Sequence, residues 1–380
     1  MNTLALYFHI PFCHNKKCDY CSFVSYCKDN YEQKVYVDAL LKEIALRGED
    51  VGKRYKISSI YFGGGTPSML EDGVFTNIMI QIKKYFRLLN NCEITIEVNP
   101  DSVTESKLRE YLLVGINRLS IGIQTLNDDI LKVIGRQHSS QQAKKAVALA
   151  KKVGFKNISI DMMIGLPYQT LSDVKKMAKF ALKSKVQHVS CYSLILEDGT
   201  PLADKIRAGV MSVPSEDDTV EMYNYCLHTF EKAGVKRYEV SNFAKEDYES
   251  KHNMTYWTMG EYLAFGLAGH SYMNDTRFAN ISDFDKYIEN INNDTLPIVS
   301  VEKLSLKKRK EEAVMLSLRT KEGIDIESFD YKFGGHLLRD KKKEIDFLHL
   351  HGFITIKKGH LCVSDNAYYV LNSIILKLIW

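Results

Sequence analysis

The chain of 380 residues is long for one ordinary domain, so its length favours either one large α/β barrel or two domains. Hydrophobic residues make up 45% of the chain and charged residues 26%, which is typical of a soluble globular protein. The formal net charge is only +4 and the Lys and Arg residues are scattered, so we expect no nucleic-acid partner. No apolar run approaches the roughly 18 residues of a membrane-spanning helix, and the N-terminus does not read as a signal peptide. We therefore expect a cytoplasmic protein whose weakly basic surface leaves peripheral contact with a membrane open.

Short β-branched or aromatic runs alternate with segments of helical period from Leu4 to about residue 245. The predicted strands, in chain order, are 4–10, 57–62, 93–98, 116–122, 157–165, 188–194 and 236–243. The helix candidates between them include 36–50, 139–154 and 218–234. Such alternation predicts a parallel sheet with right-handed crossovers, either doubly wound or curled into a whole or partial barrel. In both architectures the chemistry gathers at the C-terminal ends of the strands.

The pattern changes beyond about residue 300. The predicted elements there are helices at 306–323, 325–332 and 336–352 and a hairpin at 353–364. Helices followed by a small hairpin predict a separate C-terminal module that resembles a winged helix. The sequence leaves open whether this module contacts a substrate or only covers one end of the barrel. We expect three parts, namely a barrel at 1–245, a connecting segment at 246–300 and the C-terminal module at 301–380.

Three of the eight cysteines crowd into "CHNKKCDYC" as Cys13, Cys18 and Cys21, directly after the first predicted strand. The other five are spread singly, and we interpret them as small buried hydrophobic side chains. Structural zinc needs four protein ligands, and no second Cys or His pair stands at matching spacing. A [4Fe–4S] cluster on three cysteines leaves one iron open to a small molecule. The spacing therefore favours a cluster and leaves zinc as the alternative, with His14 as a further candidate ligand.

Glycine-rich and polar motifs stand where the other predicted strands end. "GGGTPS" (63–68) has little side chain, so its backbone N–H groups can approach a ligand, although ordinary strand-to-helix turns also use such runs. Glu97, Gln124, Arg136 and Asp161 lie on or just beyond otherwise apolar strands, where polar groups are costly unless they are paired or used. A zwitterionic ligand with a ribose would need such a carboxylate, guanidinium and set of acceptors. The residues alone leave mutual pairing and ligand binding equally open.

Seven motifs together resemble the radical S-adenosylmethionine (SAM) enzymes, and within them the oxygen-independent coproporphyrinogen oxidases and their relatives. In chain order they are "YFHIPFC", "CDYC", "YFGGGTPS", "EVNP", "RLSIGIQTLND", "DMMIGLP" and "RYEVSNFA". The resemblance implies an α/β fold, namely a partial (β/α)6 radical SAM barrel with a C-terminal helical and β extension. It also implies a [4Fe–4S] cluster on Cys13, Cys18 and Cys21 whose open iron chelates the amino and carboxylate groups of SAM. One electron, from a donor such as flavodoxin or ferredoxin, then cleaves SAM to methionine and a 5′-deoxyadenosyl radical.

The resemblance also assigns the SAM site by position, with Tyr20 against the adenine and with Gly64 and Gly65 near the methionine amino group. The full set that it implies is Tyr7, Tyr20, Phe23, Gly64, Gly65, Thr66, Glu97, Gln124, Arg136 and Asp161. One feature departs from the family, because four residues rather than three separate Cys13 from Cys18. Since the sulfur positions matter and not the contour between them, an added loop residue can bulge without moving the thiols.

Two features separate this chain from the coproporphyrinogen oxidases themselves. Those enzymes carry a further cysteine two residues after the third, where this chain has Phe23, and an N-terminal extension before the first strand. Both features match instead the HemW group, to which a heme-chaperone role is assigned: binding heme and passing it to apo-proteins, among them membrane respiratory enzymes. The alternative is a radical SAM enzyme that acts on a tetrapyrrole, by coproporphyrinogen decarboxylation or by heme methylation with ring opening. A zinc-stabilised interaction protein is a third reading, and the sequence leaves both catalysis and a homodimer open.

"HNMTYW" (252–257) matches the H-N-x-x-Y-W signature of that group at His252, Asn253, Tyr256 and Trp257. A neutral imidazole is a suitable axial ligand for heme iron, and an adjacent Tyr–Trp pair offers flat apolar area for a porphyrin. The residues alone favour a surface histidine beside two aromatic side chains that staple the barrel end to the C-terminal module. With the resemblance, we expect these four residues to contact heme. His270 is a second candidate, for the lining of a substrate pocket.

Overall fold

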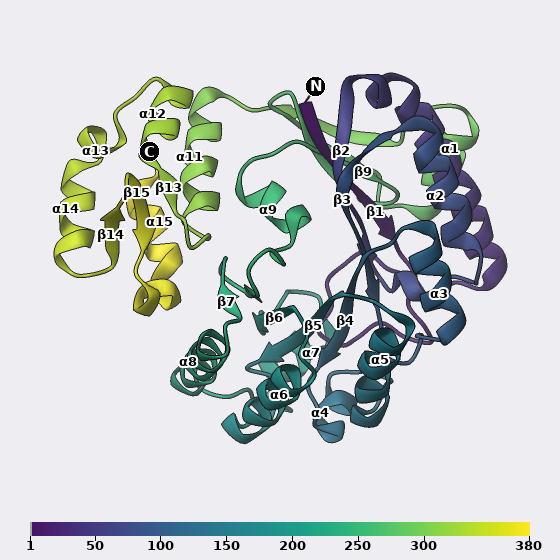
Figure 1. Ribbon diagram of the computed structural model, residues 1–380, viewed down its shortest axis with the longest axis horizontal. Coiled ribbons are helices and arrows are strands. Elements are labelled where there is room, and N and C mark those ends of the chain that lie inside the picture. The colour runs from purple at the N-terminus through teal and green to yellow at the C-terminus, as the bar shows by residue number, and fades with distance from the viewer. Residues whose placement is uncertain (1) are drawn as a thin grey trace.

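The computed structural model describes residues 2–380 and shows a large curved sheet, helices on its outer face and a smaller α/β module beside it (Figure 1). Six parallel strands pair in chain order, as a partial (β/α)6 barrel requires. They are β1 (Asn2–Ile10), β2 (Tyr55–Gly64), β3 (Arg87–Val98), β4 (Arg118–Gln124), β5 (Asn157–Ile164) and β6 (His188–Ser193). The expected fold class is confirmed.

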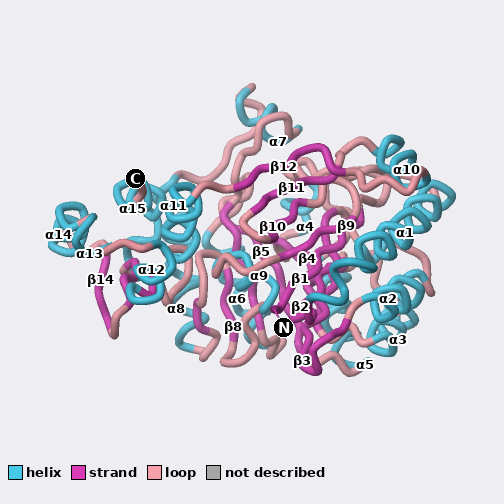
Figure 2. The backbone as a smooth tube through the Cα atoms, turned by 90° about the horizontal axis from the view of Figure 1, so that it is seen from above, coloured by secondary structure: helices cyan, strands magenta, loops and turns pink. Residues whose placement is uncertain are grey.

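The crossover helices pack against one another around the outside of this sheet (Figures 1 and 2). They are α1 (Asn30–Arg54), α2 (Val74–Tyr85), α3 (Glu105–Val114), α5 (Ser140–Val153), α6 (Leu171–Lys183) and α8 (Glu216–Lys232). Shorter helices lie in the connections, namely η1 (Pro67–Met69), α4 (Asp128–Val133) and α7 (Pro201–Arg207). Local signals set the helix ends. For example, Ser139 begins α5 with a capping box, and Gly154 ends it in the left-handed conformation (φ 119°).

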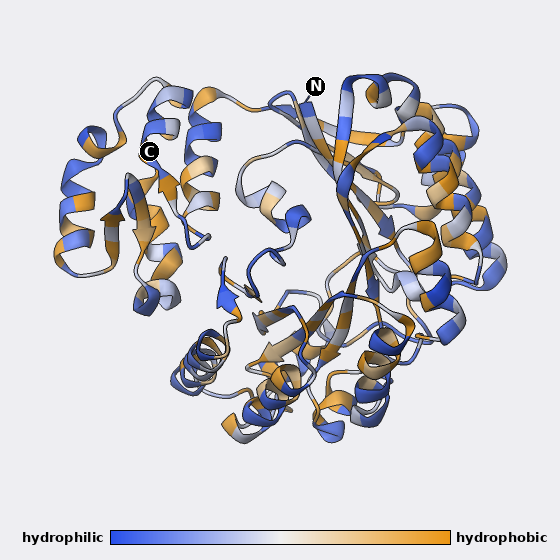
Figure 3. Ribbon diagram, viewed as in Figure 1, coloured by the Kyte–Doolittle hydropathy of each residue, from blue (hydrophilic) through white to orange (hydrophobic). Residues whose placement is uncertain are grey.

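The barrel strands alternate apolar and polar side chains. One row is apolar and belongs to the main core, as Leu6, Phe8 and Ile10 do on β1. The opposite row is polar and lines a cavity, and on β4 it consists of Arg118, Ser120, Gly122 and Gln124. Complete (β/α)8 barrels fill their interior with bulky branched side chains. The interior of this partial barrel can therefore hold a polar ligand, while the hydrophobic residues gather where helices meet the sheet (Figure 3).

The strand expected at 236–243 differs from the prediction. The chain forms two short strands there, β7 (Lys236–Arg237) and β8 (Asn242–Ala244), which pair with each other and, through β8, with β6 in the antiparallel direction. A turn closed by the hydrogen bond from Tyr238 N to Asn242 O (3.1 Å) reverses the chain between them. The sixth strand is therefore the last parallel strand on this side of the sheet.

The segment after residue 246 adds strands to the other edge of the sheet. Next to β1 lie β9 (Tyr262–Phe265), which is parallel to it, and then β10 (His270–Met273), β11 (Thr276–Asn280) and β12 (Ile298–Lys303) in antiparallel order. Helix α10 (Phe284–Asn292) packs on α1, and the short helix α9 (Lys251–Trp257) contacts β2 on the inner side of the barrel (Figure 1). Helix α9 carries the HNMTYW motif.

The C-terminal module has a hydrophobic core of its own. Its helices are α11 (Leu306–Ser317), α12 (Ile326–Phe333), α13 (Leu337–Asp340), α14 (Lys342–Leu350), η2 (Asp365–Val370) and α15 (Leu371–Leu378). Its antiparallel sheet contains, in spatial order, β13 (Ile324–Asp325), β15 (His360–Val363) and β14 (Ile354–Lys357). Helices with a small hairpin were expected here, although the predicted helix 336–352 is divided at Lys341 into α13 and α14.

Arg237 joins this module to the barrel. Its guanidinium carbon lies 3.5 Å from the centre of the Tyr368 ring, and its Nη2 pairs with Asp365. Its side chain is almost completely buried, although the Asp365 side chain is exposed.

None of the helices within residues 2–380 has the length and apolar character needed to span a bilayer.

Candidate functional site

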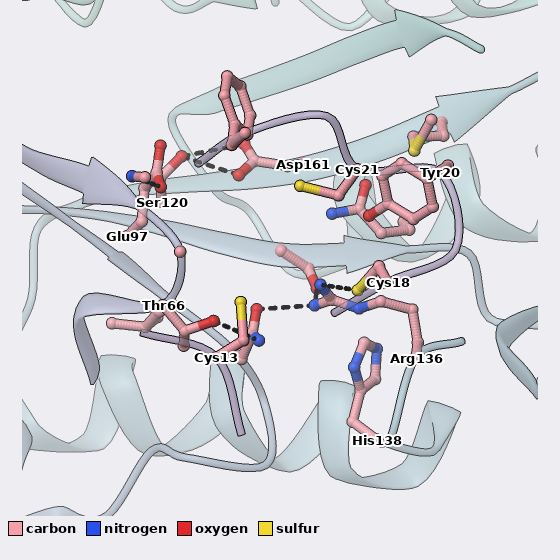
Figure 4. Close-up of a pocket in the computed structure, with 18 of the residues that line it drawn as sticks. Cys13, Cys18, Tyr20, Cys21, Thr66, Glu97, Ser120, Arg136, His138 and Asp161 are labelled. Carbon is pink, nitrogen blue, oxygen red and sulfur yellow. Dashed lines mark hydrogen bonds between the residues drawn. The ribbon is translucent and has the colours of Figure 1, made fainter. Parts of the chain in front are cut away.

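A cavity of about 400 Å³ opens at the C-terminal ends of the parallel strands, beside the loop that carries the three cysteines (Figure 4). Cys13, Cys18 and Cys21 all line it. Every residue of the expected SAM set lines it as well, with the exception of Tyr7. Residues that the motifs spread over more than 140 positions of the chain are thus brought to one place because parallel strands end at a common edge.

The cysteine loop is closed at its base by backbone contacts. Cys13 N donates to Tyr26 O (2.9 Å), and His9 Nε2 lies 2.7 Å from the carbonyl oxygen of Val24. Within the loop, Cys21 N donates to Cys18 O (3.1 Å). Of the four residues between the first two cysteines, the stretch 14–16 is exposed. Most of the connection between Cys13 and Cys18 therefore faces solvent.

The thiols and their surroundings fit a [4Fe–4S] cluster with one open iron. Three cysteines of one loop face the cavity, whereas Cys27, the next cysteine along the chain, is exposed and does not line it. Arg136 Nη1 lies 3.7 Å from Cys18 Sγ, which places a cation beside one of the three sulfur atoms. Burial raises the pKa of the Cys13 and Cys21 thiols. The open position would face a cavity lined by both polar and apolar residues.

Glu97, at the end of β3, is a half-buried carboxylate that lines this cavity. The Tyr61 hydroxyl donates to its Oε1 (2.8 Å), and the backbone N–H of Gly64 donates to its Oε2 (3.2 Å). Burial raises the pKa of Glu97 to about 7, with a further contribution from the charge of Asp161. A carboxylate held at this pKa can change its protonation state near neutral pH, and it can accept an ammonium group.

Asp161 on β5 also lines the cavity. Ser120 Oγ is 3.0 Å from both of its carboxylate oxygens, and Ser159 Oγ is 3.2 Å from Oδ1. These hydroxyls hold the carboxylate in place with lone pairs left for further donors. Gln124, at the end of β4, has a positive φ of 67°, an uncommon conformation for a residue other than glycine, which often marks a functional site.

The Arg136 guanidinium is held at the cluster end of the cavity. Its Nη2 donates to Asn99 Oδ1 (2.8 Å) and to the carbonyl oxygen of Gly122, and Asn99 Nδ2 donates in turn to Thr66 Oγ1 (3.0 Å). His138 lies beside it with its Nδ1 unpartnered within the described residues (Figure 4). Burial and the charge of Arg136 lower the pKa of His138 to about 3, so its ring is neutral.

The glycine run packs against the root of the cysteine loop. A Cβ atom added to Gly64 would lie 2.5 Å from the His9 ring, and one added to Gly65 would lie 2.5 Å from the carbonyl oxygen of Phe12. Gly64 also has a positive φ of 114°. A side chain at either position would therefore displace the cysteine loop or the strand, which explains two of the three glycines.

The HNMTYW residues on helix α9 differ in their burial and in whether they line the cavity. His252 is buried, its Nδ1 lies 3.0 Å from Ser59 Oγ, and its Nε2 lies 2.8 Å from the Tyr256 hydroxyl. Burial, with the charge of Arg118, lowers the pKa of His252 to about 3. Asn253 lines the cavity, whereas Tyr256 and Trp257 do not. The alternative of a surface histidine is therefore wrong, and both ring nitrogens of His252 are engaged in this conformation.

Tyr7 and His270 also lie outside the cavity wall. The Tyr7 ring stacks behind Tyr61 with centroids 6.3 Å apart, and its hydroxyl lies 3.1 Å from His9 Nδ1. His270 is exposed on β10, where its Nδ1 lies 2.9 Å from the carbonyl oxygen of Ala268. Tyr7 thus supports the wall from behind, and His270 faces away from the chemistry.

Several cavity residues were missed by sequence reasoning. They are Tyr61, Asn99, Arg118, Ser120, His138, Ser190 and Tyr192. Arg118 and Ser120 precede Gln124 at alternate positions of β4, and this period-two spacing was the signal that could have found them. Tyr61 and Asn99 stand within the quoted motifs YFGGGTPS and EVNP, whereas no quoted motif contains His138, Ser190 or Tyr192.

Comparison with known proteins agrees with this geometry. Residues 7–181 match the Radical SAM superfamily, and residues 304–370 match the HemN C-terminal domain. The chain is 36% identical to the heme chaperone HemW of Lactococcus lactis, over 87% of this chain and 85% of that protein. It is 35% identical to the heme chaperone HemW of Bacillus subtilis, over 88% of each chain.

A solved structure shares the fold over the full length. It is the coproporphyrinogen III oxidase HemN of Escherichia coli, described as a radical SAM enzyme, with a TM-score of 0.87. The sequence identity is 21%, and the match covers 100% of this chain and 90% of that one. The cysteine loop, the strand-end polar residues and the two relatives above all lead to one assignment. The chain belongs to the HemW family within the radical SAM superfamily.

Proposed function

We propose that this protein is a heme chaperone that binds a [4Fe–4S] cluster and SAM, binds heme, and transfers heme to apo-proteins. The observation that carries the proposal is the identity of about a third to proteins named heme chaperone HemW, which extends over nearly nine-tenths of the chain. The cavity supports the SAM part, because a thiol-rich mouth, a half-buried carboxylate and a guanidinium meet within it.

The roles of the cavity residues follow from their chemistry. Cys13, Cys18 and Cys21 would hold the cluster, which when bound supplies one electron to SAM. Glu97 would accept the hydrogen bonds of the methionine amino group, and Arg136 would donate to its carboxylate. Asp161, with lone pairs left after Ser120 and Ser159, would accept from the ribose hydroxyls. Tyr20 would pack against the adenine.

Phe23 supports chaperoning over decarboxylation. Coproporphyrinogen oxidases resemble this chain but carry a cysteine at that position, whereas Phe23 is 64% exposed at the rim of the cavity. An apolar ring at the mouth offers contact to a flat ligand and no thiol chemistry. Decarboxylation, or methylation with ring opening, is the second candidate function, because the SAM cavity alone would serve either.

The heme contacts of helix α9 stay a prediction. Iron ligation by His252 would require that its bonds to Ser59 and Tyr256 break, since both ring nitrogens are engaged. Asn253 needs no such movement to meet a ligand, because it already lines the cavity. We further propose that a protein such as flavodoxin or ferredoxin donates the electron. Heme would be delivered to membrane respiratory enzymes from the cytoplasmic side. A homodimer is the oligomeric state to test.

The test is an anaerobic heme titration of the cluster-loaded protein, followed by transfer to an apo-acceptor and by a parallel assay for loss of coproporphyrinogen. We expect tight heme binding and transfer without loss of coproporphyrinogen. Turnover of coproporphyrinogen would show that decarboxylation proceeds without the additional cysteine, and it would replace the chaperone proposal with the enzyme alternative.

A further inference from the structure

Arg118 is a buried cation at the inner end of the cavity. Its side chain is only 2% exposed, and it lines the cavity. Within residues 2–380 its Nε has no hydrogen-bond partner, and none of the ion pairs formed there includes its guanidinium. A buried charge is costly unless it is paired. A bound group that accepts hydrogen bonds from Arg118 would therefore contribute more binding free energy than the same group at a guanidinium that is already paired.

The two carboxylates that face Arg118 are already engaged. Glu93 accepts from Ser250 Oγ (3.3 Å) and from the backbone N–H groups of Lys251 and His252 (both 3.2 Å), at the start of α9. Asp161 accepts from two serine hydroxyls, as described above. Both carboxylates act on Arg118 through their charge without taking up its N–H groups. The two carboxylates therefore balance the charge of the Arg118 guanidinium, but they do not accept hydrogen bonds from its N–H groups.

Arg118 and Arg136 occupy opposite ends of the cavity. Arg136 is bonded to Cys18, Asn99 and Gly122 at the cluster end. Arg118 begins β4, whereas Arg136 Nη2 reaches the carbonyl oxygen of Gly122, which is about 13 Å further along the strand at the usual rise of a parallel strand. Of the residues that the family resemblance assigns to SAM, Asp161 acts on Arg118 through its charge, whereas Arg136 contacts Cys18. Arg118 is therefore placed to meet a different negatively charged group.

We propose that Arg118 forms a second, carboxylate-binding subsite at the inner end of the cavity, which takes a propionate side chain of the tetrapyrrole. The planar guanidinium matches a carboxylate with two parallel hydrogen bonds. Heme and its relatives carry propionates, so the choice of this ligand rests on the proposed function. Neutral donors of the same cavity, Ser190, Tyr192 and Asn253, are available to the rest of the bound group.

The experiment compares a metal-free porphyrin, mesoporphyrin IX, with its dimethyl ester, and thereby removes iron ligation from the measurement. Fluorescence titrations use the cluster-loaded wild type, Arg118→Lys and Arg118→Gln. We expect the wild type to bind the free acid at least about tenfold more tightly than the ester. Arg118→Gln should lose this preference. Arg118→Lys should keep part of it, because lysine keeps the positive charge but cannot donate two parallel hydrogen bonds to one carboxylate. Heme binding of the wild type is measured separately.

The outcomes separate the subsite from the chaperone proposal. Equal binding of acid and ester by the wild type, with heme still bound, would overturn the subsite and leave chaperoning intact. A preference for the acid that persists in both variants would place the carboxylate contact elsewhere. SAM and decarboxylated SAM form the second arm, and a carboxylate preference for SAM that disappears in Arg118→Gln would assign Arg118 to SAM instead. Absence of any tetrapyrrole binding by the wild type would overturn both proposals.

Discussion

The imidazole of His252 stacks on the ring of Tyr61, with centroids 5.0 Å apart and planes inclined by 27°. The Tyr61 hydroxyl donates in turn to Glu97 Oε1 (2.8 Å). The histidine of the HNMTYW motif therefore stands directly behind the aromatic side chain that holds the half-buried carboxylate of the cavity. Helix α9, which carries this motif, also forms part of the cavity wall through Asn253.

Because of this stack, His252→Ala is expected to weaken SAM binding by about twofold to twelvefold, as loss of an aromatic pair costs about 0.5–1.5 kcal/mol. His252→Phe keeps a ring against Tyr61 and should recover most of the affinity. Calorimetric titration with SAM measures both variants, and His270→Ala is the matched control because His270 is exposed away from the cavity. Unchanged SAM affinity in His252→Ala, together with loss of the heme-bound spectrum, would instead identify His252 as an iron ligand.

Cys18→Ala should abolish the cluster despite the longer loop, because only three cysteines line the cavity and a [4Fe–4S] cluster on two protein thiols is poorly held. Cys27→Ala should retain it, since Cys27 is exposed outside the cavity. Iron, acid-labile sulfide and zinc are measured after anaerobic reconstitution. Zinc in place of iron, or a full cluster in Cys18→Ala, would show that the loop ligates in another way.

SAM affinity should rise with pH up to about 7. Glu97 must be ionised to accept the ammonium group, and burial raises its pKa to about 7. Below that value, binding requires loss of a proton, so affinity should fall by up to about tenfold for each pH unit. Glu97→Gln should bind SAM weakly and without this slope. A flat profile for the wild type between pH 6 and 8 would contradict the role of Glu97.

The same shift has the opposite effect on folding. Between pH 4.5 and about 7 the native Glu97 holds a proton that the unfolded chain has released. Its contribution to stability is therefore complete below pH 4.5 and is lost as the pH rises through about 7. The free energy of unfolding of the SAM-free protein should thus fall less steeply with pH in Glu97→Gln than in the wild type, as denaturant titrations over this range would show.

Arg237→Ala should loosen the C-terminal module. The guanidinium stacks on Tyr368 at 3.5 Å in a buried position, where such a contact is worth about 2 kcal/mol. Limited proteolysis should then release a fragment that begins near residue 304, and the midpoint of thermal unfolding should fall. Arg207→Ala is the control, because its ion pair with Asp198 is exposed and contributes little. Equal protease resistance of the two variants would show that Arg237 does not join the parts.

The residues that local motifs mark could be predicted from the sequence, and the structure brings them together. Cys13, Glu97 and Asp161 stand at strand ends, and parallel strands carry their ends to one edge. His252 could not be placed, because its partner Ser59 is 193 positions away and nothing near His252 indicates a buried ring. Strands β9 and β10 have only four residues each, so they show no clear alternation, and the pairing of β9 depends on the distant β1.

The backbone of Gly64 and Gly65 connects the cysteine loop with the Glu97 carboxylate. Gly65 N donates to Ile10 O (2.9 Å) just before the cysteine loop, and Gly64 N donates to Glu97 Oε2 (3.2 Å). One short stretch of backbone therefore fixes the position of the cysteine loop relative to the Glu97 carboxylate. A distortion of this turn would misalign the metal-binding end against the substrate-binding end, even with every ligating side chain unchanged.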